Sequence, residues 1–214
     1  MLPRITLLFG LTSALHGATV VDRLAVVVNR NVIKASDIDR DLRVTEFLNG
    51  EAADFSSAAR RKAAERLIEQ ILLRQEISSG GFRRASAEEA SALLNRIRQD
   101  RFGGSQARMR AELAKFRLTE DALREQLQWQ LTVLRFIDQR FRSGVLVTDE
   151  EVRAYYDQHK ADLERQYPRD NRFETLAPKI RASLEGERVN QNFAESIEQA
   201  RKRSRIRFLQ GAFQ

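Results

Sequence analysis

The chain has 214 residues, of which 42% are hydrophobic and 31% charged, with 10 glycines, 3 prolines and no cysteine. This composition excludes collagen-like, disulfide-scaffold and wholly disordered proteins, and the length suffices for one or two globular domains. Its 37 basic and 30 acidic residues give a net charge of +7, which favours acidic partners without identifying them.

The N-terminus has the pattern of a secretory signal peptide. Arg4 precedes an uncharged apolar run over residues 5–15, and small residues follow at 17–19. A basic start, a short apolar stretch and a small-residue exit are typical of such signals, and the run is too short to span a membrane. We therefore expect a signal peptide over residues 1–18 (cleavage after Ala14 is the alternative) and a mature protein in the periplasm, without stable membrane insertion. An exported protein does not meet the genome, so we expect no nucleic-acid partner.

The pattern after the signal predicts a hairpin followed by helices. Residues 19–28 are rich in β-branched side chains and, with residues 32–34 beyond an asparagine-containing turn, predict a β-hairpin. Apolar residues then recur with helical spacing, and Ser86 with Glu89 and Thr148 with Glu151 form capping boxes. We expect helices over about residues 37–48, 57–79, 86–103, 106–116, 119–141 and 148–159.

The C-terminal part predicts a return of the chain to its beginning. Residues 160–172 are polar and charged and are expected to form a linker. A last helix is expected from Thr175, with Pro178 tolerated in its first turn. Residues 204–209 alternate between apolar and arginine side chains, which is the period of a strand with one wet face. We expect this strand to pair with the N-terminal hairpin.

Patterns of catalysis and metal binding are sparse. No glycine precedes a lysine, so there is no phosphate-binding loop, and His16 lies in the expected signal peptide. His159 alone would have to supply a metal site or a catalytic base, and we interpret it as a solvated residue at the end of a helix. We expect no catalytic residue, no metal and no cofactor.

Several segments of the chain, taken in order, resemble segments of one known family. The N-terminal domain of the SurA-like periplasmic chaperones, relatives of the parvulin-type peptidyl-prolyl isomerases, is similar to residues 20–29 (VVDRLAVVVN), 32–39 (VIKASDID) and 63–73 (AAERLIEQILL). Residues 118–127 resemble the helix before that family's isomerase module, and residues 147–156 resemble the entry into the module. Residues 180–209 resemble the C-terminal helix and strand that return to the N-terminal domain.

The resemblance implies a mainly α-helical fold with a small sheet that joins the N-terminal strands to the C-terminal strand. It implies one helical body formed by residues 19–159 and 173–214, with residues 160–172 in place of a parvulin module. Thirteen residues are too few for such a domain. No histidine follows His159, so the paired histidines of the module have no counterparts and we expect no isomerase activity.

The function implied by the resemblance is that of an ATP-independent holdase for unfolded or nascent outer-membrane polypeptides. Such a protein needs exposed apolar surface in a cleft, and the two apolar stripes of the helix over 119–141 could supply it. The expected lining is Trp129, Val133 and Phe136, with Phe47 and Tyr155 behind them. Packing against neighbouring helices is an equally good interpretation of each residue taken singly.

Other interpretations stay open. Arg135, Arg140 and Arg142 would either attract acidic client segments or form a solvated face, which we favour. The chain could also be an isomerase relative with residual activity, or a periplasmic assembly subunit with one dedicated partner. A homodimer is compatible with the sequence.

Overall fold

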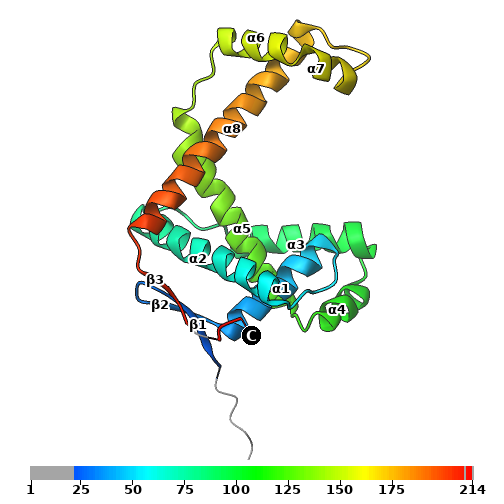
Figure 1. The fold of residues 1–214 in the computed structure, drawn as a ribbon. Helices are drawn as coiled ribbons and strands as arrows, with labels where there is room; N and C mark the ends of the chain where they lie inside the picture. The colour runs from blue at the N-terminus through cyan, green and yellow to red at the C-terminus, as the bar shows by residue number, and fades with distance from the viewer. Residues whose placement is uncertain (1–21, 210, 214) are drawn as a thin grey trace, which may run out of the picture.

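The computed structural model describes residues 22–209 and 211–213 (Figure 1), so the expected signal peptide lies outside the described residues. The described chain is mainly α-helical with one small antiparallel sheet, which confirms the predicted fold class. In chain order the elements are β1 (Leu24–Val28), β2 (Asn31–Lys34), α1 (Ala35–Asn49), α2 (Ser57–Ser79), α3 (Ala87–Phe102), α4 (Gln106–Lys115), α5 (Glu120–Phe141), a 3-10 turn (Arg142–Gly144), α6 (Asp149–Gln158), α7 (Lys160–Gln166), α8 (Phe173–Lys202) and β3 (Ile206–Phe208).

The sheet joins the two ends of the described chain, as predicted. Its order is β2-β1-β3, and β3 lies antiparallel to β1 with Val26 opposite Phe208. Asn29, in the left-handed conformation at the hairpin turn, fixes this pairing because its side chain accepts from the Arg205 N–H (2.9 Å) and donates to the Ser204 hydroxyl (3.1 Å). The inner face of the sheet packs on α1 and α2, so the last strand completes the core that the first strands begin.

Two predicted helix starts differ from the structure. The first helix, expected from residue 37, begins at Ala35 directly after β2, so Ser36 lies inside α1, and the Asp37 carboxylate accepts the Lys34 N–H at 3.0 Å. In the C-terminal part, α8 starts at Phe173, two residues before the prediction, so Pro178 lies in its second turn. There the proline leaves the Glu174 carbonyl without its helical donor. The segment 160–172, predicted to be a linker, contains the seven-residue helix α7.

Both predicted capping boxes are present, and they make the stability of the fold depend on pH. Hydrogen bonds from the Ser86 N–H and from Arg135 hold the pKa of Glu89 below its ordinary value, and bonds from Arg188 and Thr148 do the same for Glu151. A carboxylate whose folded pKa is lowered stabilises the fold above its unfolded pKa, and this contribution disappears as the pH falls through the folded pKa.

We therefore expect the urea midpoint of unfolding to fall as the pH drops below about 4.3, the ordinary pKa of glutamate. The double variant Glu89→Gln, Glu151→Gln keeps an acceptor at each cap but cannot titrate, so its midpoint should fall less over the same range. An equal fall in both proteins would contradict an origin in these caps.

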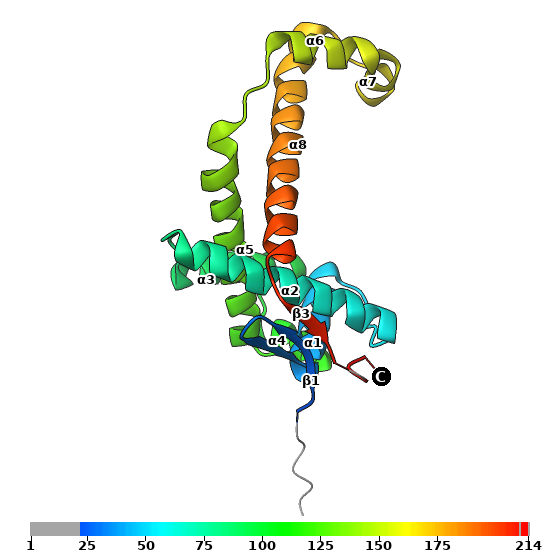
Figure 2. The same ribbon diagram turned by 60° about the vertical axis from the view of Figure 1, so that its left-hand side comes forward.

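The overall shape consists of a body and an arm. The body contains the sheet, α1 to α4 and the first half of α5, while the arm contains α6, α7 and the first turns of α8. The long helices α5 and α8 connect the two, as Figures 1 and 2 show from two directions. No helix in the described part of the chain is both long enough and apolar enough to cross a membrane.

A buried hydroxyl fastens α5 to the segment before α3. Thr132 accepts the Ala85 N–H at 3.0 Å and donates to the Gln128 carbonyl at 2.7 Å, while the Gln128 amide donates to the Ala85 carbonyl at 2.8 Å. Ala85 and Thr132 are both buried, so water cannot replace these bonds.

Replacing Thr132 by valine keeps the shape but leaves the Ala85 N–H without a partner. We expect the free energy of unfolding to fall by about 1–3 kcal/mol, measured by urea denaturation. Thr132→Ser, which keeps the hydroxyl and loses only the methyl group, should lose clearly less, and a loss in Thr132→Val no larger than that in Thr132→Ser would contradict the stabilising role of the hydroxyl.

Candidate functional site

The five residues predicted to line a client cleft do not meet in one place. Phe47 is fully buried in the core between α1, α3, α4 and α5. Trp129 and Phe136 are buried, with the half-buried Val133 beside them, where α5 faces α2 and α8. Tyr155 is half-buried in the arm, and its ring stacks on His159 with centroids 4.1 Å apart. The residues divide among three packing clusters because α5 uses both apolar stripes for contacts with other helices.

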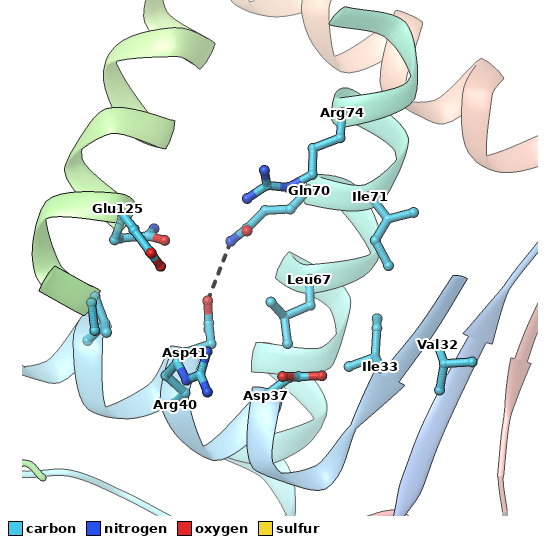
Figure 3. Close-up of a pocket in the computed structure, with 13 residues that line it drawn as sticks. Val32, Ile33, Asp37, Arg40, Asp41, Leu67, Gln70, Ile71, Arg74 and Glu125 are labelled. Carbon is cyan, nitrogen blue, oxygen red and sulfur yellow. Dashed lines mark hydrogen bonds between the residues drawn. The ribbon is translucent and has the colours of Figure 1, made fainter. Parts of the chain in front are cut away.

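A hollow in the body lies elsewhere, between β2, α1, α2 and α5 (Figure 3). We call it the trough. Its volume is about 350 Å³. Ile33, Val44, Leu67 and Ile71 form an apolar floor, and the exposed Val32 lies at its edge. Polar side chains complete the lining, which comprises Val32, Ile33, Asp37, Arg40, Asp41, Val44, Leu67, Gln70, Ile71, Arg74, Ala122, Glu125 and Gln126.

A buried carboxylate fixes the geometry of one wall. The Asp41 side chain is only 7% exposed and binds the Arg66 guanidinium at 2.5 Å, while the Gln70 amide donates to its other oxygen at 3.5 Å. Burial raises the pKa of Asp41, against the opposing effects of Arg66 and Gln70. Because α1 and α2 are held together by this pair, the wall is preformed rather than made by a ligand.

The end of the trough near α5 carries a cation held by an aromatic ring. The guanidinium of Arg74 lies over the Trp129 ring, 4.0 Å from its centroid. Burial and the neighbouring Arg84 both lower the pKa of Arg74. In Figure 3 the Glu125 side chain, from α5, lies across the trough from Gln70 and Arg74. The rim therefore presents both signs of charge.

The trough suits the binding of a segment that carries both apolar and polar groups. None of its lining residues is a histidine, serine, threonine, cysteine or lysine, and its carboxylates are those of Asp37, Asp41 and Glu125. Within the described residues no group of three or more histidine, cysteine or acidic side chains could hold a metal ion. An apolar floor with a polar rim can cover an apolar group while it bonds to polar groups beside it.

Two curated relatives are similar to much of this chain, whereas no protein-family model matches it. Chaperone SurA of Chromobacterium violaceum is 33% identical over 137 residues, which are 62% of this chain and 31% of that protein. Chaperone SurA of Pseudomonas putida is 29% identical over 149 residues, 68% of this chain and 34% of that protein. The chain is SurA-like. It spans about a third of the length of the curated relatives it matches.

Sequence reasoning found the SurA-like segments but missed the trough. Asp37 lies in the first turn of α1, where acidic residues are common for electrostatic reasons, and nothing in the pattern separates Asp41, in the second turn, from its neighbours. The trough needs residues from four elements that are distant in sequence, and only the packing of α5 across α1 and α2 brings them together.

Proposed function

We propose that this SurA-like chain is an ATP-independent chaperone of the periplasm that holds unfolded polypeptides, including outer-membrane proteins, in the trough. The observation that carries the proposal is the trough itself, a preformed apolar floor with a rim of both charges, in a chain similar to proteins named Chaperone SurA. An unfolded chain offers apolar side chains flanked by backbone polar groups, and such a surface covers both.

The dimensions of the trough favour short segments over folded partners. A volume of about 350 Å³ admits a few side chains of an extended chain and is too small for a domain. The exposed large apolar side chains of the described residues are few, Leu24, Val32, Leu134 and Leu146, so the protein can offer this surface with little tendency to associate with itself. Weak, repeated contacts of this kind are sufficient for a holdase because release needs no energy source.

The test uses two matched strand variants. Val32 lines the trough and is 43% exposed, while Leu24, on the neighbouring strand, is 49% exposed and lies outside it. Val32→Asp puts a charge at the edge of the apolar floor, and the loss of one apolar contact of about 1.5 kcal/mol should weaken binding of an unfolded porin about tenfold. Leu24→Asp makes the same kind of change at a similar exposure and should leave binding within about twofold.

The measurements are suppression of aggregation of a urea-unfolded porin and the affinity of the porin for each variant. Thermal melting of both variants checks that the fold is kept. Equal losses in the two variants, or none in Val32→Asp, would contradict the trough as the client site. A proline-limited refolding assay on the same preparations addresses the isomerase interpretation, and we expect no acceleration.

A further inference from the structure

A second hollow lies on a different face of α1, where the loop 50–56 approaches the turn between α4 and α5. We call it the basic hollow. Its volume is about 470 Å³, and it adjoins a smaller one of about 420 Å³ with which it shares Ala53, Lys115 and Phe116. None of the residues that line the trough lines either of these hollows. The trough and the basic hollow therefore share no lining residue.

The charge of the basic hollow is one-sided. Its lining contains four cations and a single carboxylate, Asp39, which is bound to Arg60 at 3.1 Å. Lys115 is bound to Glu112 at 2.6 Å. The side chains of Arg43 and Arg117 have no ion pair or hydrogen bond among the described residues. Within the described part of the chain, these two guanidinium charges at the hollow have no carboxylate partner.

Aromatic rings form the rest of the wall and hold the cations in place. Two guanidinium groups lie over the ring of Phe55: that of Arg43 is 5.3 Å from the ring centroid and that of Arg60 is 5.9 Å from it. Phe116, also half-buried, lines both this hollow and its neighbour. The cation–π contact restricts Arg43, which has no ion pair among the described residues, so less of its freedom is lost when an anion binds it. The wall therefore presents apolar surface and positive charge together.

The backbone at Arg117 is an independent observation at the same place. Its φ is +52°, in the left-handed region, at the position after α4 where helices commonly end on glycine. The Arg117 N–H donates to the Ala114 carbonyl and the Leu118 N–H to the Leu113 carbonyl, both at 3.0 Å. A long side chain in this conformation costs stability, and such strain concentrates at functional positions.

We propose that the basic hollow binds acidic segments of polypeptides, in which carboxylates lie beside an apolar side chain. The carboxylates would pair with Arg43 and Arg117 while the apolar side chain contacts Phe55 and Phe116. A concave site of this size admits an extended chain, whereas a flat bilayer surface cannot enter it. The inference rests on the proposed function only in that the ligand is a polypeptide, and it assigns a second site with a chemistry that the trough lacks.

The experiment measures binding of a short fluorescent peptide that contains aspartates and one phenylalanine, by fluorescence anisotropy with the whole folded protein. The same peptide with asparagine at each aspartate is the matched ligand. We expect the acidic peptide to bind more tightly, and the difference to shrink as salt is added. Arg43→Gln and Arg117→Gln should each weaken it about three- to tenfold, while Arg96→Gln, at an exposed position of α3 outside the hollow, should change it less than about twofold.

Arg117→Gly separates a binding role from a structural one. Glycine relieves the left-handed backbone, so this variant should melt at a higher temperature than the parent and yet bind the acidic peptide more weakly. A higher melting temperature with unchanged binding would overturn the proposal. Equal binding of the acidic and asparagine peptides would also overturn it. So would a protein that binds no peptide but binds phosphatidylglycerol vesicles, if Arg43→Gln and Arg117→Gln abolish the vesicle binding.

Binding at the trough and binding at the basic hollow can be tested separately. Val32→Asp should leave binding of the acidic peptide unchanged, because Val32 is not part of the basic hollow. Loss of porin binding in Val32→Asp with retained peptide binding supports both sites as distinct. Peptide binding that depends on Val32 and not on Arg43 would overturn the basic hollow and leave the trough standing.

Discussion

Phe47→Ala is expected to lower the free energy of unfolding by about 3–5 kcal/mol, close to the whole stability of many small proteins. The Phe47 ring is fully buried, stacks on Phe102 with centroids 6.4 Å apart and meets Phe116 edge-on at 5.6 Å. The Arg101 guanidinium lies 4.9 Å above the ring and also donates to the Phe47 carbonyl at 2.8 Å. Alanine would leave a cavity and remove partners from three other side chains.

Urea denaturation measures this loss, and Phe47→Leu is the matched control. Leucine keeps most of the buried volume, so its loss should be much smaller than that of alanine. Phe47 was predicted from the sequence to line the client cleft, and the two interpretations give opposite results. A Phe47→Ala protein that keeps its stability and loses client binding would restore the binding interpretation.

The sequence predicts the elements well where local chemistry determines them. The capping boxes at Ser86 and Thr148 and the apolar alternation around Phe208 each contain their own signal, so the helix starts and the returning strand follow from a few residues. Pairing of that strand with β1 is a contact over most of the chain length; the alternating pattern led us to expect it, and the family resemblance implies it as well.

The predicted site residues show what periodicity cannot provide. Apolar spacing tells which residues of α5 avoid water and does not tell whether another helix or a client covers them. Trp129 and Phe136 are covered by α2, α8 and Phe82, which are contacts that no local pattern encodes. The sequence left the same ambiguity at Arg135, Arg140 and Arg142 of α5 and the turn after it. Arg135 pairs with Glu89 and Arg142 with Asp138, in agreement with the solvated-face interpretation.

The sequence pattern does not predict a binding site at Arg43 and Arg117, two cations of the basic hollow. Arg43 belongs to the polar face of α1, and Arg117 to a two-residue turn, so both read as ordinary surface positions. Only the fold shows that the loop 50–56 brings Phe55 against Arg43 and that Arg117 adopts a left-handed backbone. Tertiary placement therefore decides the site in both hollows, while local chemistry decides the elements that carry them.

Phe136→Ala is expected to have an effect of similar size, about 3–5 kcal/mol in the free energy of unfolding, at the place where the arm joins the body. The Phe136 ring is 4% exposed and meets Phe82 edge-on at 4.8 Å and Phe141 edge-on at 5.8 Å. Phe141 in turn meets Phe193 of α8 at 5.8 Å. These rings connect the segment before α3, α5 and α8, so the truncation should loosen α8 against α5 as well as lower stability.

The control is on the same helix, two residues away. Leu134 is 63% exposed, so Leu134→Ala should change the free energy of unfolding by less than about 0.5 kcal/mol. Hydrogen exchange should show faster exchange in α8 for Phe136→Ala and not for Leu134→Ala, because only the first removes a ring of the series. If Phe136→Ala kept both the parent's stability and its protection in α8, the rings would not be what holds the arm, and they would be free to meet a client.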